Sequence, residues 1–160
     1  MKVVYIPDVG ETYGAAISFK EMVSGLNRIY GVEPVILTSQ TGILTEYAKE
    51  NDFETHAIGH KAFLISSGST PVRKFIKKSL KPYYKMQYKK AIEAAIHEAE
   101  KYVDFSQVDL IHSNVNRNDV GALLAEKYGI PHVWHIREFG DKDYECFSLR
   151  DSYIEFMNSH

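Results

Sequence analysis

The sequence predicts an α/β protein, a Rossmann-like open parallel sheet of at least five strands flanked by helices. Short apolar runs rich in Val and Ile alternate along the chain with segments whose apolar residues recur at helical spacing. This alternation is typical of parallel sheets, because each helix carries the chain back to begin the next strand. With 160 residues, the chain has the length of one domain with one hydrophobic core.

The first part of the chain contains three predicted strands and two predicted helices. Apolar residues between Ala15 and Ile29 recur every three or four positions, and Gly31 follows them as a helix C-cap. The glycine- and serine-rich stretch after the third strand shows no clear period, so we expect a loop there. The predicted order is strand 3–7, helix 15–29, strand 33–38, helix 42–51, strand 53–58 and loop 59–70.

The second part continues the alternation. Pro82 suits the first turn of a long helix with an apolar stripe, because no backbone N–H is needed there. Asn118 or Asp119 caps a later helix, and Gly129 ends it. The predicted order is helix 82–103, strand 108–112, helix 119–128, strand 132–136 and helix 149–157.

Composition and charge limit the classes of function. The single cysteine, Cys146, forms no disulfide within the chain, and the first residues lead directly into a strand rather than a signal peptide. These two features favour a cytoplasmic protein, and no apolar run approaches the roughly 20 residues of a membrane span. Residues 55–92 hold nine of the 19 Lys and Arg residues and no acid, which leaves 10 basic against 21 acidic residues elsewhere. The near-neutral net charge of the chain therefore combines one basic segment with an acidic remainder.

Three polar loops follow predicted strands, at residues 8–14, 113–118 and 137–143. Ligands of open parallel sheets bind beyond the carboxyl ends of the strands, so we expect these loops to form one site. The first loop places Gly10 and Gly14 before a helix, where free N–H groups favour an anion such as a diphosphate. The loop lacks G-x-G-x-x-G and a Walker lysine, which argues against dinucleotide and P-loop enzymes. Alternatively, the glycines only let the chain turn into its helix.

The second loop carries side chains that both donate and accept hydrogen bonds. His112, Asn114, Asn116 and Arg117 crowd the end of a buried strand, where they reach sugar hydroxyls or phosphate oxygens. The alternative for His112 is a core histidine whose hydrogen bonds are satisfied.

The third loop begins with Arg137 and Glu138, which are placed for substrate unless they form an ion pair that closes the loop. Strand alternation puts His132 and His135 on opposite faces of the fifth strand. With one cysteine and no H-E-x-x-H motif, this argues against a metal site.

Several runs in the second half of the chain resemble the first domain of glycosyltransferase family 4. They are Ile111-His112-Ser113-Asn114, residues 121–125, residues 128–131 and residues 132–140. The resemblance is sharp from about residue 109 to 144 and weakest between 59 and 81. It implies the GT-B architecture, in which two Rossmann-like domains face each other across a cleft. Residues 1–160 are then the N-terminal, acceptor-binding domain, and the nucleotide-sugar domain with its Glu-x7-Glu signature is absent from this chain.

The resemblance also implies an activity for the full-length protein. We expect a retaining glycosyltransferase that uses no metal or cofactor and moves a sugar from a nucleotide-sugar donor to a glycan or lipid-linked acceptor. Cell-envelope or exopolysaccharide biosynthesis is the expected setting. The isolated chain is expected to be inactive, because half a cleft cannot position both substrates.

Individual residues take roles from the same resemblance. The donor diphosphate is expected near Gly10, Gly14 and Ala15, where this chain has Gly-Ala in place of the usual Gly-Gly pair. His112 and Asn114 are the catalytic candidates. Many family members have His-x-His here, and Asn114 replaces the second histidine, so it cannot act as a titrating base near neutral pH.

The basic segment suggests a further partner. Because family 4 acceptors are often lipid-linked, residues 73–90 are a candidate for peripheral contact with the anionic inner face of the cell membrane. The alternative is a solvated helix face. The acidic remainder and the polar loops argue against nucleic acid as the ligand. A second class of function is a non-catalytic Rossmann-like binding module, or the acceptor-binding or membrane-docking subunit of a split transferase.

Overall fold

The structure is a computed structural model that describes residues 1–8, 13–136 and 145–160 of the chain. Its centre is a five-stranded sheet in the order β3-β2-β1-β5-β6, and every pairing in that sheet is parallel. The predicted α/β class and the parallel five-stranded sheet are confirmed. The strands are β1 (Lys2–Ile6), β2 (Glu33–Thr38), β3 (Glu54–Ala57), β5 (Leu110–Ser113) and β6 (His132–Trp134).

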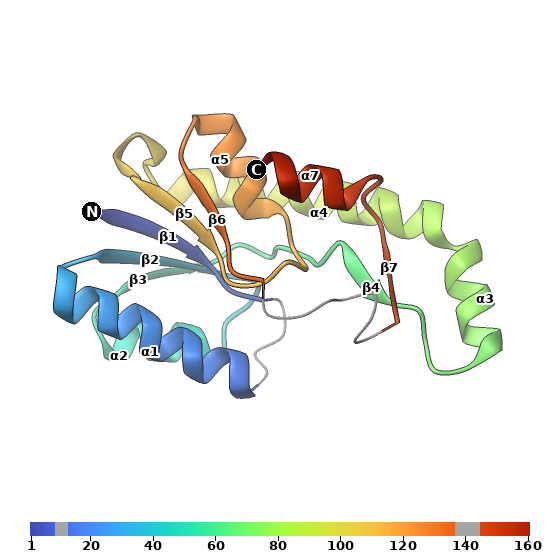
Figure 1. The fold of residues 1–160 in the computed structure, drawn as a ribbon, viewed down its shortest axis with the longest axis horizontal. Helices are drawn as coiled ribbons and strands as arrows, with labels where there is room; N and C mark the ends of the chain where they lie inside the picture. Colours follow the sequence, from blue (N-terminus) through green and yellow to red (C-terminus); the bar gives the residue numbers. More distant parts are fainter. Residues whose placement is uncertain (9–12, 137–144) are drawn as a thin grey trace.

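Helices cover both faces of this sheet (Figure 1). On one face, Val3 and Tyr5 of β1 pack with Phe19 in a core shared with α1 and α2. On the other face, Val4 and Ile6 belong to a core shared with α4 and α5. Two cores arise because successive side chains of a strand point to opposite faces. The helices are α1 (Tyr13–Tyr30), α2 (Ile43–Glu50), α4 (Lys81–Tyr102) and α5 (Val120–Tyr128).

Two predicted helix ends are confirmed, and one predicted cap has a different role. Gly129 ends α5 in the left-handed conformation at φ 66°, and Gly31 follows α1 at φ 64°. Asp119 stands at the N-cap position of α5, but its side chain makes no capping hydrogen bond. Its carboxylate binds other partners, described below.

The stretch predicted to be a loop at 59–70 contains a strand. There, β4 (Leu64–Ser66) pairs antiparallel with β7 (Cys146–Ser148) in a separate two-stranded sheet. A three-residue strand has no readable period, and its partner lies far away in sequence.

The helical boundaries also differ from the prediction at two places. A separate helix, α3 (Pro71–Ser79), precedes α4, and Oγ1 of Thr70 caps it by accepting from the N–H of Arg73. Pro82 explains the break between α3 and α4, because its ring clashes with the backbone of the preceding turn. The last helix, α7 (Tyr153–Ser159), begins four residues later than predicted, since β7 and its following turn occupy the earlier residues. Within the described part of the chain, no helix is both long enough and apolar enough to span a bilayer.

Candidate functional site

The strand order reverses between β1 and β5. The chain runs outward from β1 to β2 and β3, then returns to the other side of β1 with β5. Because β1 and β5 are parallel, with Tyr5 beside His112 and Ile6 beside Ser113, both strands end at the same edge of the sheet. Open α/β sheets bind their ligands in the crevice at such a reversal. The candidate site therefore lies between the segments that follow Ile6 and Ser113.

The segment after β5 is bonded to the end of β1. The N–H of Asn114 donates to the carbonyl of Ile6 at 2.9 Å, and Nδ2 of Asn118 donates to the carbonyl of Pro7 at 3.3 Å. Nη1 of Arg117 donates to Oδ2 of Asp8 at 3.2 Å. The first and second predicted loops thus meet at the described part of this edge, as the sequence predicted.

His112 is buried at the end of β5, with 8% of its surface exposed. Its ring lies 5.5 Å from the ring of Tyr5 and 5.7 Å from the ring of His135, measured between centroids. Tyr5 belongs to the core under α1, so His112 faces the α1 side of the sheet. His135 comes to His112 from the end of β6, a pairing that the sequence did not indicate.

Asn114 and Ala15 are brought together, as the predicted site requires. They line a small hollow with Asp8 and Ala16, of about 10 Å³. That volume admits about one water molecule, so the hollow alone cannot hold a sugar. Asn116 is also buried, at 7% exposure.

Gly14 lies in the first turn of α1. Gly14 is exposed, and a Cβ added to it would contact nothing within 4 Å. Packing against residues 1–8, 13–136 and 145–160 therefore does not require a glycine at position 14. Three other predicted site residues, Gly10, Arg137 and Glu138, lie outside the described residues.

The predicted separation of His132, in β6, and His135, just after it, onto opposite faces is confirmed. Nε2 of His132 lies 2.9 Å from Oγ of Ser113, on the face covered by α5, while His135 faces His112 on the opposite side. Burial lowers the pKa of His132. Among residues 1–8, 13–136 and 145–160, no group of three His, Cys, Asp or Glu side chains is arranged to hold a metal ion.

The structure adds a buried polar network that the sequence did not indicate. Asp119 is fully buried, and Oδ2 of its carboxylate accepts from Nε of Arg150 at 2.6 Å and from the hydroxyl of Tyr88. Burial, followed by the charge of Asp119, raises the pKa of Tyr88. Arg150 lies just after β7, so this network joins α4, α5 and the C-terminal segment.

A buried histidine lies in the stretch after β3. His60 is fully buried, and burial lowers its pKa to about 4. Phe63, close behind it, donates its N–H to the carbonyl of Arg117 at 2.8 Å. This stretch therefore contacts the segment after β5 at Arg117, although its residues show no period in the sequence.

Comparison with known proteins shows a likeness of fold to a solved structure. No protein-family model matches the chain, and no curated protein matches it. The crystal structure of MurG from Acinetobacter baumannii, a glycosyltransferase of GT-B architecture, superposes with a TM-score of 0.51 at 16% sequence identity. The fold resembles one half of a GT-B enzyme. The match covers 91% of this chain but only 39% of MurG, so the chain spans well under half of that enzyme's length.

Proposed function

We propose that this chain is the acceptor-side half of a retaining glycosyltransferase similar to family 4. The complete protein moves a sugar from a nucleotide-sugar donor to a glycan or lipid-linked acceptor, in cell-envelope or exopolysaccharide biosynthesis on the cytoplasmic side of the membrane. The observation that carries the proposal is the buried polar segment after β5, at the strand reversal of a fold similar to one GT-B half.

The polar residues of this segment fit the recognition of a sugar. The amide groups of Asn114 and Asn116 both donate and accept hydrogen bonds, which suits hydroxyl groups. Arg117 is partly exposed and suits phosphate oxygens. The N-terminus of α1, with Gly14 and Ala15, suits the donor diphosphate, because its first backbone N–H groups and the helix dipole favour an anion. Because the hollow beside Asn114 admits only about one water, the sugar must bind between this segment and an opposing domain.

We assign catalysis mainly to positioning. The acceptor oxygen bonds to the anomeric carbon as the bond from that carbon to the diphosphate breaks, and the acceptor proton leaves with the diphosphate. Asn114 holds a reacting hydroxyl but takes no proton near neutral pH. His112 is packed between Tyr5 and His135 and supports the segment that carries Asn114. It is the catalytic candidate that β5 itself contributes.

A transfer assay on the complete protein that contains this chain tests the proposal. The assay supplies a panel of nucleotide sugars with membrane extracts as acceptors and measures release of nucleoside diphosphate. We expect Asn114→Ala to lower kcat/KM about tenfold or more, because a hydrogen bond made in the transition state is lost. The matched control is Asn158→Ala, an exposed asparagine of α7. Donor binding without turnover would favour the non-catalytic module instead.

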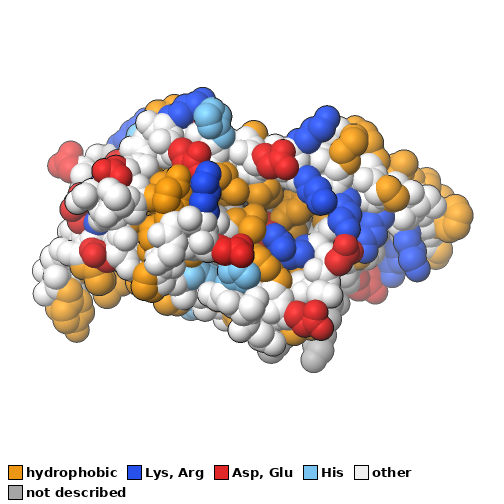
Figure 2. Space-filling model, turned by 90° about the horizontal axis from the view of Figure 1, so that it is seen from above, with side chains coloured by type: hydrophobic (Ala, Val, Ile, Leu, Met, Phe, Trp, Pro, Cys, Tyr) orange, Lys and Arg blue, Asp and Glu red, His pale blue; other side chains and the backbone are white. Residues whose placement is uncertain are grey.

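We further propose that residues 73–90 contact an anionic membrane. No residue of α3 is buried, and its apolar side chains Val72, Phe75 and Ile76 are 68%, 74% and 49% exposed. Lysines and an arginine alternate with them, and Figure 2 shows basic and hydrophobic side chains gathered at that end of the molecule. An amphipathic helix of this kind lies in the headgroup region of a bilayer.

Vesicle sedimentation tests the membrane contact. We expect binding to vesicles with anionic lipid, weaker binding at high salt, and weaker binding of Phe75→Asp. The control is Ile17→Asp, which places the same charge at another exposed apolar residue, on α1. Equal loss in both variants, or equal binding to neutral vesicles, would contradict the contact.

A further inference from the structure

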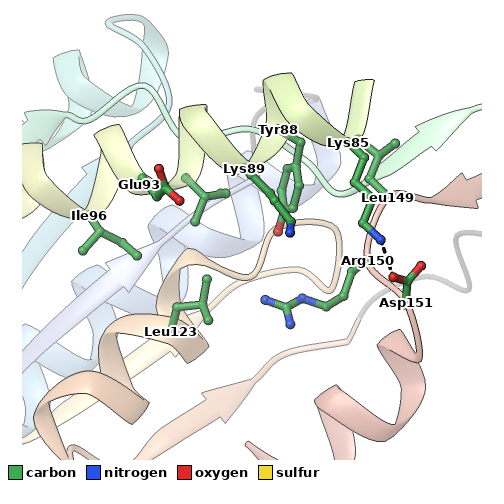
Figure 3. A pocket seen from close by; sticks show the side chains of 10 residues that line it. Lys85, Tyr88, Lys89, Glu93, Ile96, Leu123, Leu149, Arg150 and Asp151 are labelled. Atoms are coloured by element: carbon green, nitrogen blue, oxygen red, sulfur yellow. Dashed lines mark hydrogen bonds and ion pairs between the residues drawn. The ribbon is translucent and has the colours of Figure 1, made fainter. Parts of the chain in front are cut away.

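A groove of about 430 Å³ lies between α4, α5 and the segment after β7 (Figure 3). It opens on the face seen in Figure 2, where hydrophobic side chains line a depression bordered by basic ones. The apolar part of its wall comes from three separate elements, which contribute Ile92, Ile96, Leu123 and Leu149. The groove is therefore a composite of α4, α5 and the C-terminal segment.

One cation of the groove is held rigidly. Nε of Arg150 donates to the fully buried Asp119 at 2.6 Å, and its guanidinium carbon lies 3.6 Å from the centre of the Phe156 ring. Figure 3 shows the two terminal nitrogens of Arg150 directed into the groove, on the side where Tyr88 lies. A guanidinium fixed in this way presents a preformed fork of N–H donors for a phosphate or carboxylate.

A second cation is directed into the same space. Lys89 extends from α4 toward Arg150 in Figure 3, and no ion pair joins it to another described residue. Lys85, by contrast, is already paired with Asp151. The carboxylate of Glu93 lies farther along α4, toward Ile96, away from the two cations. The basic end of the groove therefore has donors for an anion, and the apolar wall continues beside it.

We propose that this groove binds a phosphate ester carried on an apolar chain. The phosphate lies against Arg150 and Lys89, and the chain lies along Ile92, Ile96 and Leu123. A phosphate ester carries up to two negative charges near neutral pH and so suits two cations better than a carboxylate does. Asp119, which holds Arg150, directly follows the polar segment assigned to the acceptor, so the ester anchors the acceptor. This last step rests on the proposed function.

Calorimetric titration of the 160-residue chain with decyl phosphate, below its micelle concentration, tests the groove directly. Inorganic phosphate and decanol are the comparison ligands. We expect decyl phosphate to bind tightest, since only it has both parts. We expect Lys89→Ala and Arg150→Lys each to weaken its binding about tenfold. The matched control, Lys49→Ala, removes an exposed lysine of α2 that does not line the groove and leaves binding unchanged.

The outcomes separate the groove from the transferase. Arg150→Lys keeps a positive charge beside Asp119, and Lys89 is exposed, so at least one variant folds normally. Decanol binding as tightly as decyl phosphate, or all three variants behaving alike, would overturn the inference even if the complete protein transfers sugar. Specific decyl phosphate binding by a protein without transferase activity would keep the groove and refute the proposed function. If the chain binds vesicles but does not bind monomeric decyl phosphate, the inference about the groove is also overturned.

Discussion

Arg117 and Asp8 form an ion pair of 3.2 Å between the segment that follows β5 and the segment that follows β1. The two residues are 109 positions apart in the chain, and the pair lies at the strand reversal of the parallel sheet. Asp8 is 10% exposed at its side chain and Arg117 is 30% exposed, so solvent screens the pair only in part. The pair therefore holds both sides of the candidate site in one arrangement.

Replacing this arginine should loosen the site. We expect Arg117→Ala to lower the free energy of unfolding by about 1 kcal/mol, and Arg117→Lys to lower it less because the charge is kept. Urea denaturation measures both. Arg28→Ala, at the exposed end of α1, is the control and should change stability little. Equal stability of Arg117→Ala and the parent chain would mean that the pair contributes nothing.

Gly121 is required by packing. A Cβ at this position would lie 2.3 Å from Oγ of Ser113 and 3.2 Å from Cδ1 of Ile6. We expect Gly121→Ala to lower the free energy of unfolding by about 2 kcal/mol, because the core must shift to admit the methyl group. Gly25→Ala is the matched control, since a Cβ there meets nothing within 4 Å. Gly25→Ala should raise the free energy of unfolding by about 0.5 kcal/mol, because alanine favours the helix. If thermal unfolding shows a similar effect for both substitutions, packing does not require a glycine at position 121.

The hydroxyl of Tyr88 should be important for stability because it donates to a fully buried carboxylate. Tyr88→Phe keeps the ring but leaves Asp119 with one fewer donor, so we expect a loss of about 2 kcal/mol in urea unfolding. Tyr84→Phe, on the same helix and partly buried, is the control and should cost little. A loss in Tyr84→Phe as large as in Tyr88→Phe would contradict the role of the network.

Stability should fall in mild acid because of His60. Its pKa is about 4 in the folded chain, against an ordinary value of 6.5, so the unfolded chain takes up the proton first. The contribution of His60 to the free energy of unfolding is fully present above pH 6.5. It is lost as the pH falls toward 4, and the total loss is about 3 kcal/mol. Burial lowers the pKa of His132 too, with the same sign, so a variant must separate the two.

The variant His60→Leu isolates this contribution. We expect its free energy of unfolding to depend less on pH between 6.5 and 4 than that of the parent chain. His97→Gln, at an exposed position of α4, should keep the parent's dependence. Unchanged pH dependence in His60→Leu would show that His60 is protonated freely in the folded chain.

The parts of the fold that depend on local patterns were predictable. The alternation of His132 and His135 follows from the two-residue period of a strand, and the C-caps at Gly31 and Gly129 follow from the need for a positive φ. The meeting of the segments after β1 and β5 followed from the general rule for parallel sheets.

The remaining features depend on contacts between distant residues. Asp119 has the composition of a helix cap, but in the structure its carboxylate is used by Tyr88 and Arg150, each 31 positions away. The pairing of β4 with β7 joins two three-residue segments that have no period of their own. Sequence patterns report the faces of single elements, whereas these features arise only when elements from opposite parts of the chain pack together.

A crystal structure of the complete protein with bound nucleoside diphosphate tests the proposed transferase most directly. We expect a second Rossmann-like domain opposite the residues that follow β5, with the diphosphate at the N-terminus of α1 and Asn114 facing the space between the domains. A diphosphate bound elsewhere, or Asn114 and Arg117 facing open solvent with no opposing domain, would contradict the assignment.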